Sequence, residues 1–349
     1  MSFVFRPAAT VEIDGQSLTA AEAGLERLEI VLAAGAHGFA ALELWPRSKF
    51  ASAAPGAVLI VSLGDGETVL TGKVAAVAKR ASSLRIEALD ATARLSSTRI
   101  SATFRDLSVA DIVNNLAGEA GVGTDTVDGD LKLETYAVDT RRTLWRHLKD
   151  LAALTGADLS ASSDGKLRFA TPTGGAAKRR LRFGADLLEW RTVDRDQAPA
   201  PGFAAHGATS EGGSRAWHNL LPDPLGESPP WSRIFGALRS REAADTAIKA
   251  AQIRAARSKT PAWALTLGAP ELRLGDVVEI SGLNGGSISL PGVGDLGIGG
   301  AGGGTPYRAT SIRHCFDGTS GFTTALELEG TGEDASLLGA LGALAGGLA

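Results

Sequence analysis

Residues 56–77 read GAVLIVSLGDGETVLTGKVAAV, and this stretch decides the fold of the first part of the chain. Two runs rich in Val, Leu and Ile flank Gly64-Asp65-Gly66, which supplies the positive φ angles of a tight turn at low cost, so we predict a β-hairpin. Ser82-Ser83 then turns the chain into Leu84–Asp90, a third strand pattern. Consecutive antiparallel strands of this kind predict a small antiparallel sheet or barrel over residues 1–100.

Residues 101–172 follow a helical pattern instead. Ser108 precedes a segment whose apolar residues share one helical face, and Asp111 stands three residues later, as in a capping box. A second helix is expected over residues 140–155. Glycines end both helices, and a hairpin turn follows the second: Gly121, Gly156 and Ser163–Gly165. We therefore predict a compact α+β domain here.

Strand patterns return in residues 173–330. The expected strands are Leu181–Phe183, Leu187–Thr192, Ala262–Leu267, Asp276–Ile280, Tyr307–His314 and Thr323–Glu329. The same range holds a Pro- and Gly-rich loop insertion at 199–230, an alanine-rich helix at 240–259 and a Gly-rich insertion at 282–305. A small-residue apolar tail, 331–349, follows.

The two β regions share an order of features. Gly56-Ala-Val-Leu-Ile-Val and Gly275-Asp-Val-Val-Glu-Ile each place a glycine before a β-branched run, and each is followed by a Gly-bearing turn and by strands that end the region. This order indicates a duplicated barrel. The expected fold class is mostly β with an α+β insertion.

Composition excludes several classes of protein. The 349 residues carry a formal net charge of -4, which disfavours a dedicated nucleic-acid binder. A single cysteine, Cys315, rules out an internal disulfide, so we expect folding in the cytoplasm. The N-terminus has no secretory-signal pattern, and the longest apolar stretch, Leu337–Ala349, is shorter than the roughly 20 residues that span a bilayer.

No sequence pattern predicts a catalytic, cofactor or metal site. His314 and Cys315 are neighbours in a strand and point to opposite faces, so we expect a buried thiol beside a surface or interface histidine. The five histidines lie far apart, without the spacing of zinc ligands. The sequence Gly297–Gly302 matches the Gly-x-Gly-x-x-Gly motif of dinucleotide-binding proteins. We interpret the match as accidental, because a strand pattern rather than a helix follows it.

Two charged groups allow a structural interpretation beside a functional one. The basic run Lys178–Arg182 fits a channel that passes nucleic acid, but an exposed strand edge protected by charge is the favoured interpretation. Glu327 and Glu329 share one strand face, and without a substrate cleft we expect them to be solvated.

The C-terminal tail is the candidate interface. Four leucines recur at helical spacing among Gly and Ala, which permits a close-packed seam between copies: Leu337, Leu341, Leu344 and Leu348. The hypothesis is that this tail packs against other copies of the chain or docks into a partner protein. The alternative is a frayed end, because glycine costs about 1 kcal/mol per helix position.

The order of motifs resembles the late control D family of phage tail hub proteins, which is related to the N-terminal hub part of VgrG spikes. The resemblance covers roughly residues 10–330 and rests on Gly56–Val61, Val69–Val74, Ala88–Asp90, Phe104–Val113, Leu144–Ala152 with Thr155-Gly156, Ser163–Phe169, Leu272–Val278, Tyr307–His314 and Gly321–Leu328. It implies two tube-like antiparallel β-barrel domains per chain.

The resemblance also implies a function. Three chains would form a pseudo-sixfold ring that joins a hexameric tail tube to a trimeric spike, in contact with other baseplate proteins. The C-terminal tail would then pack at the threefold axis of this ring or dock into the spike protein. DNA or cargo would pass the channel without sequence-specific binding. Because the β pattern ends near residue 330, the spike is expected to be a separate protein. The expected location is the tail or baseplate of a virion, or an assembled injection particle.

Two other function classes stay open at this point. A tail-associated cell-wall hydrolase would need an acid, nucleophile or metal constellation. A carbohydrate-binding β module would need exposed aromatic platforms, for which Trp217 and Trp231 are the support. The sequence does not distinguish a phage from a gene transfer particle or a protein-injecting system.

Overall fold

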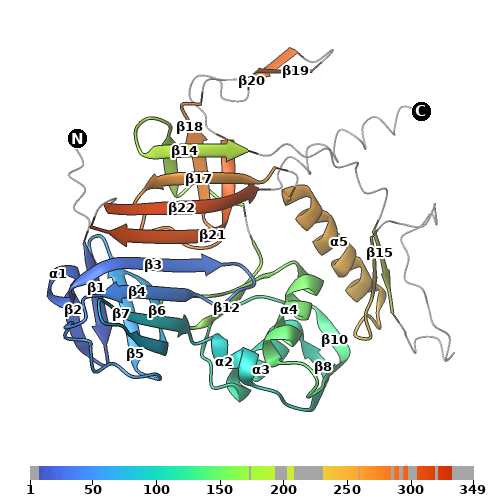
Figure 1. The fold of residues 1–349 in the computed structure, drawn as a ribbon. Helices are drawn as coiled ribbons and strands as arrows, with labels where there is room; N and C mark the ends of the chain where they lie inside the picture. Colours follow the sequence, from blue (N-terminus) through green and yellow to red (C-terminus); the bar gives the residue numbers. More distant parts are fainter. Residues whose placement is uncertain are drawn as a thin grey trace.

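The computed structural model describes residues 8–172, 174–192, 203–207, 231–258, 260–283, 287–290, 294–297, 305–318 and 321–331. The described chain is mostly β, with a large curled sheet and all but the first short helix gathered to one side of it (Figure 1). This is the expected fold class, a mostly β chain with an α+β insertion. Among the described helices, none is long and apolar enough to cross a membrane.

The first β unit contains the predicted hairpin. Its elements are β1 (Ala9–Ile13), β2 (Gln16–Thr19), α1 (Ala20–Ala23), β3 (Leu25–Ala33), β4 (Phe39–Leu44), β5 (Val58–Leu63), β6 (Glu67–Lys79) and β7 (Leu84–Asp90). β5 pairs with β6 in antiparallel fashion, and the turn glycines Gly64 and Gly66 have φ angles of 61° and 97°. Alternate residues of β5 and β7 are buried, as expected of strands with one face on a core.

The α+β unit follows, with the expected Ser108 cap and glycine stops, although its second helix begins at Leu144, four residues later than predicted. It comprises α2 (Ala93–Ser97), β8 (Ala102–Ser108), α3 (Val109–Glu119), β9 (Thr124–Val127), β10 (Lys132–Val138), α4 (Leu144–Thr155), β11 (Asp158–Ala161) and β12 (Leu167–Ala170). Ser108 caps α3, since its Oγ accepts from the Asp111 N–H at 3.1 Å and donates to the Asp111 carboxylate at 2.6 Å. Gly156 ends α4 in the left-handed conformation.

The second β unit is discontinuous in sequence. Its strands are β13 (Arg179–Arg182), β14 (Leu187–Thr192), β17 (Ala262–Leu267), β18 (Val277–Ser281), β21 (Thr305–Asp317) and β22 (Gly321–Gly330). Between them lie the parallel pair β15 (Phe203–His206) and β16 (Trp231–Ile234), and the helix α5 (Arg241–Arg257). Within the Gly-rich insertion, β19 (Ser287–Leu290) and β20 (Gly294–Gly297) form a hairpin.

Helix α5 packs on the α+β unit, although in sequence it lies within 173–330. Its buried alanines, including Ala243 and Ala247, join the core that contains Leu148 and Leu151 of α4. The approach is close: a Cβ added at Gly156 would lie 3.2 Å from the Cβ of Ala250. Small residues on both sides permit this contact, so the helix forms a bridge from the second β unit to the α+β unit.

One sheet runs through both β units. Thirteen strands of the described chain belong to it, along the path β14-β17-β22-β21-β3-β4-β7-β6-β5-β1-β2, with β13 and β18 joined beside β21. The junction is the antiparallel pair β3–β21, which lie side by side in Figure 1 and which we call the seam. In its register, Ile30 lies opposite His314. Leu32 packs against the cores of both units, and Phe322 of β22 belongs to the first core.

The two β units repeat one strand order. The strand order of the first unit is β1-β5-β6-β7-β4-β3, and that of the second is β13-β18-β21-β22-β17-β14. The two orders differ in one pairing, because β1 is antiparallel to β5 whereas β13 is parallel to β18. Equivalent hydrogen bonds recur: the Gly56 N–H donates to the Val74 carbonyl at 2.8 Å, and the Gly275 N–H donates to the Ala309 carbonyl at 2.8 Å. The duplication indicated by the sequence is therefore present in the backbone.

Candidate functional site

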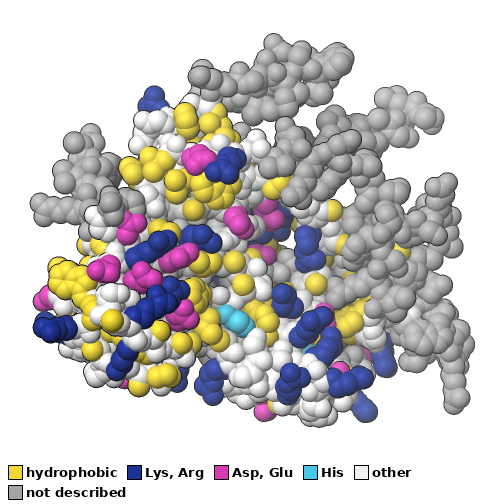
Figure 2. Space-filling model, in the orientation of Figure 1, with side chains coloured by type: hydrophobic (Ala, Val, Ile, Leu, Met, Phe, Trp, Pro, Cys, Tyr) yellow, Lys and Arg dark blue, Asp and Glu magenta, His cyan; other side chains and the backbone are white. Residues whose placement is uncertain are grey.

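The outer face of the seam carries charges of both signs. We call the following residues the polar seam face: Arg27, Glu29, Glu43, Arg85, Glu87 and Arg313. Arg85 bonds Glu43 at 3.1 Å and Glu87 at 2.8 Å, and Arg313 lies 3.5 Å from Glu29. Figure 2 shows the basic and acidic side chains interleaved over this part of the surface. Cross-strand pairs between β21, β3, β4 and β7 thus give the surface nearly balanced charge.

A hollow of about 240 Å³ lies on the polar seam face. Two arginines, two glutamates and one alanine line it: Arg27, Arg85, Glu29, Glu43 and Ala41. Because each arginine has a carboxylate beside it, the hollow offers no surplus charge for an anion or a cation. We therefore interpret the face as a polar surface rather than as a ligand site.

A buried ion cluster ties the α+β unit to the second β unit. Arg308 of β21 has a side chain only 5% exposed; it bonds Asp158 of β11 and lies 2.5 Å from Glu329 of β22. Burial lowers the pKa of Arg308, but the two carboxylates outweigh burial and raise it above the ordinary value. Arg308 and Asp158 lie 150 positions apart, and no local sequence signal links them.

A second contact ties the first β unit to the α+β unit. The His37 ring, between β3 and β4, lies 2.8 Å from the Thr92 hydroxyl and 2.6 Å from the Ser96 hydroxyl, with its centroid 4.2 Å from that of Trp145 in α4. Asp90 is buried and accepts from the Gly38 N–H and the Thr92 N–H. Burial raises the pKa of Asp90 and lowers that of His37.

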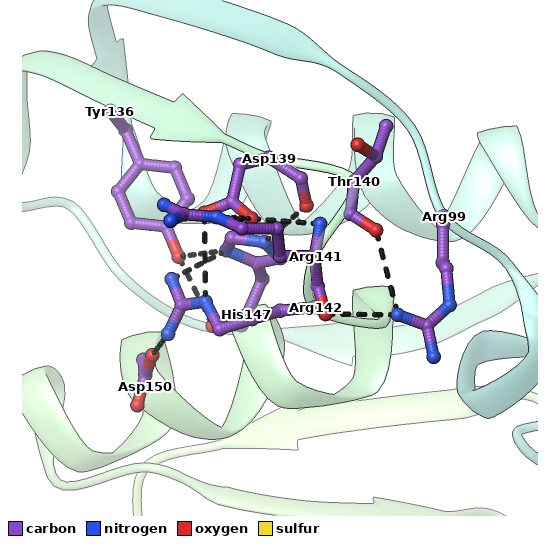
Figure 3. A network of polar contacts seen from close by, with 8 residues as sticks. All are labelled: Arg99, Tyr136, Asp139, Thr140, Arg141, Arg142, His147 and Asp150. Carbon is purple, nitrogen blue, oxygen red and sulfur yellow. Dashed lines mark hydrogen bonds and ion pairs between the residues drawn. The ribbon is translucent and has the colours of Figure 1, made fainter.

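Polar contacts inside the α+β unit fix the start of α4 (Figure 3). Arg142 pairs with Asp150 and lies 3.9 Å from Asp139, while the buried His147 ring lies 3.2 Å from the Tyr136 hydroxyl. Burial and the nearby Arg142 lower the pKa of His147. All of these side chains are satisfied by one another, so the cluster has the character of a structural network and not of an exposed catalytic group.

The expected roles of His314 and Cys315 are reversed. His314 is 1% exposed, with Nδ1 3.0 Å from the Thr324 hydroxyl, whereas Cys315 is half-buried on the opposite face. The sequence predicted correctly that the two side chains face opposite sides of the strand. It predicted the wrong one, Cys315, as the buried residue. The reason is the seam, where β3 pairs with this part of β21. Which face of β21 becomes buried depends on that pairing, and the local sequence does not show it. Burial raises the pKa of the Cys315 thiol.

The basic run at β13 is matched by carboxylates. Lys178 lies 3.0 Å from Asp276, Arg179 lies 2.6 Å from Glu271, and Arg180 lies 2.9 Å from Glu279. This pairing favours the structural interpretation of the run over a nucleic-acid channel. Glu327 is exposed as expected, but the prediction of a solvated Glu329 was wrong, because Glu329 pairs with buried Arg308.

The predicted interface leucines lie outside the described residues: Leu337, Leu341, Leu344 and Leu348. Trp217 also lies outside them, and Trp231 is described as part of β16. Within the described ranges, no three His, Cys, Asp or Glu side chains gather closely enough to hold a metal ion. The contacts that sequence reasoning missed are those between units, since each joins residues distant in the chain.

We predict that Arg308→Met lowers the free energy of unfolding by about 3–5 kcal/mol, because Asp158 and Glu329 lose their shared cation. Urea denaturation at neutral pH measures the change. The matched control is Arg313→Met, whose side chain is 57% exposed beside Glu29 and which should cost less than about 1 kcal/mol. Equal losses in the two variants would contradict a structural role for the buried cluster.

We predict a pH dependence of stability from His314. Burial lowers its pKa to about 3, against about 6.5 when unfolded, so between these values only the unfolded chain binds the proton. Its contribution is complete above pH 6.5 and is lost as the pH falls, by at most about 1.4 kcal/mol per pH unit. In His314→Gln, urea unfolding between pH 4 and 6 should show a slope smaller by up to this amount. An unchanged slope would contradict the assignment.

Comparisons with known proteins find relatives in structure only. No protein-family model matches the sequence, and no curated protein matches it either. The 43 kDa tail protein of prophage MuSo2 from Shewanella oneidensis is 16% identical, with a TM-score of 0.66 over 94% of this chain and 99% of that chain. A tail protein from Neisseria meningitidis is 14% identical, with a TM-score of 0.66 over 93% of this chain and 97% of that one.

A third similar structure comes from a secretion apparatus. The E. coli c3393 protein, a component of the type VI secretion system described as similar to the T4 tail proteins gp27 and gp5, is 11% identical, with a TM-score of 0.59. The match covers 91% of this chain and 76% of that chain. The resemblance seen in the motifs is confirmed at the level of structure: this chain has the fold of phage tail proteins and of a related secretion component.

Proposed function

We propose that the chain is a structural hub protein of a phage tail or contractile injection particle. Three copies form a pseudo-sixfold ring that joins a hexameric tail tube to a separate trimeric spike. The observation that carries this proposal is the duplication along one sheet: two equivalent β units per chain, taken three times, supply six similar positions. The tail proteins that share the fold are consistent with such a role.

The polar seam face suits the wall of the channel in this ring. It lies on the side of the sheet opposite the cores and spans both units, as the strand pairs of β21, β3, β4 and β7 require. Its arginines and glutamates offset one another. DNA or other cargo would therefore pass without sequence-specific or strongly electrostatic binding. Other baseplate proteins and the spike would bind elsewhere on the ring.

The proposed role is not enzymatic. The titratable groups with shifted pKa values in the described chain, such as Asp90, His147 and His314, are buried and bonded to structural neighbours. A cell-wall hydrolase needs convergent groups beside a substrate cleft, and the hollow described above has paired charges instead. Among the described aromatic residues, Trp45 and Phe183 are exposed, at 59% and 49%, and these two, which stand on different β units, are what the carbohydrate-binding alternative could use.

Sedimentation of the purified full chain tests the proposal. We predict a trimer in equilibrium with monomer, with the trimer fraction rising with protein concentration. A strict monomer under all conditions, including with an added spike partner, would contradict the ring.

Sedimentation also tests the role of the four leucines in the C-terminal tail. Deletion of residues 334–349 should lower the trimer fraction or abolish spike binding if Leu337, Leu341, Leu344 and Leu348 pack at the threefold axis or in the spike. Unchanged assembly and spike binding would reject this part of the proposal and leave the ring itself intact.

A further inference from the structure

Four polar side chains at the joint between the first β unit and the α+β unit form one continuous chain of hydrogen bonds. The Ser96 hydroxyl of α2 lies 2.6 Å from Nε2 of His37, and Nδ1 of the same ring lies 2.8 Å from the Thr92 hydroxyl. The Thr92 hydroxyl donates to the Asp90 carboxylate at 2.5 Å. We call these four residues the Ser96 relay. The proposed ring makes no use of it.

The directions of these hydrogen bonds fix the tautomer of His37. Asp90 accepts from the backbone N–H groups of Gly38 and Thr92 as well as from the Thr92 hydroxyl, as an ionised carboxylate does. Because the single hydroxyl proton of Thr92 is donated to Asp90, its oxygen accepts from Nδ1–H of His37. Nε2 then carries no proton, so it accepts from the Ser96 hydroxyl.

Burial decreases from one end of the Ser96 relay to the other. Asp90 and Thr92 are 4% and 0% exposed, His37 is half-buried, and Ser96 is exposed. The Trp145 ring packs against the imidazole, with 4.2 Å between centroids. The buried residues and Trp145 therefore hold the imidazole in place, while the Ser96 hydroxyl is open to a small molecule from solvent.

A nucleophilic serine needs the groups that the Ser96 relay contains. Its hydroxyl is a weak nucleophile until a neutral imidazole within about 2.6–3.2 Å accepts its proton and a third group holds that imidazole in the right tautomer. The distance between Ser96 and His37 lies in this range. Burial lowers the pKa of His37 and nearby Lys149 lowers it further, against the opposing effect of Asp90, so the imidazole is neutral at pH 7.

We infer that Ser96 is an activated serine that accepts an acyl group from small activated esters. Its Oγ forms a bond to the acyl carbon, the hydroxyl proton passes to Nε2 of His37, and the C–O bond to the leaving group breaks. The leaving group departs as an anion, and the proton then passes from His37 to water. This reactivity goes beyond the proposed structural role and is independent of the ring.

The position of Ser96 limits the class of substrate. The Ser96 relay supplies a base and no clamp for the carbonyl oxygen, so the esters that fit are those whose leaving groups depart readily. Ser96 is exposed on α2, which lies beside α4 (Figure 1). A cell-wall polymer needs an extended binding cleft, whereas a small ester can reach an exposed hydroxyl directly.

Acylation by p-nitrophenyl acetate tests the inference. The full chain is used in a Cys315→Ser background, which removes the thiol as a competing nucleophile. We expect an initial burst of p-nitrophenolate equimolar with the chain, and a peptide map of the acid-quenched protein should place the acetyl group on Ser96. Ser96→Ala should abolish the burst, and His37→Asn should slow it by at least about a hundredfold, because the general base is lost.

The matched control is Ser97→Ala, the neighbouring serine of α2. The Ser97 hydroxyl donates to the Arg94 carbonyl at 2.9 Å instead of to an imidazole, so this variant should keep the full burst. Thr92→Val tests the positioning role of the Thr92 hydroxyl, since valine keeps the shape of the side chain but cannot hold Nδ1–H. It should slow the burst by at least about tenfold.

The pH profile of the burst separates a chemical role of His37 from a structural one. Only the neutral imidazole accepts the proton, so the rate should rise with pH and level off above a midpoint below 6.5, the ordinary pKa of histidine. The charged groups that act on the ring are Asp90 of β7, which raises its pKa, and Lys149 of α4, which lowers it. A structural role alone would give no such midpoint.

Three results would overturn the inference: a burst that survives in Ser96→Ala, acetylation of Ser97 as fast as that of Ser96, or a rate that climbs steadily from roughly pH 7 to 9, as hydroxide-driven attack does. Urea unfolding shows whether His37→Asn and Thr92→Val are folded. If either variant is unfolded, the peptide map and the pH profile of the chain with His37 and Thr92 intact decide. Sedimentation reports on the ring separately, so a failed burst leaves the proposed function standing.

Discussion

An antiparallel ladder of seven residue pairs joins β3, near the start of the chain, to β21, near its end. The ladder holds the two β units in one sheet, buries His314 and brings Phe322 into the first core. The intervening α+β unit is then held from both sides, by the His37 ring packed at a tilt against Trp145 and by Arg308 bonded to Asp158. Closing so long a loop costs little more entropy than closing a shorter one, so packed contacts at the seam can offset it.

Much of the local structure could be predicted from the sequence. The hairpin at residues 56–77, the Ser108 cap and the glycine stops Gly121 and Gly156 each depend on neighbours in the chain, and the structure has each of them. The duplication was also visible, because two glycine-led strands stand at equivalent places. The seam was not, because pairing between β3 and β21 depends on residues almost 300 positions apart and neither strand carries a signal for its partner.

The polar residues of the candidate site could also be predicted only in part from the sequence. Alternation along a strand predicted that His314 and Cys315 face opposite sides, but which side is buried depends on β3. The strand pattern predicts that Glu329 is exposed, but in the fold Glu329 is the partner of the buried Arg308. What the structure adds for function is therefore mostly the description of a surface: a sheet face with balanced charge that spans both β units.

We expect the seam to make the two β units one cooperative body. Urea unfolding with one buried thiol in each core tests this coupling, in a Cys315→Ser background: Ala88→Cys for the first unit and Ala264→Cys for the second, both fully buried positions. Pulsed thiol labelling reports when each core opens. If the two cores unfold together, both thiols report the same midpoint and the same unfolding free energy. Two well-separated midpoints, with one core open while the other stays closed, would contradict it.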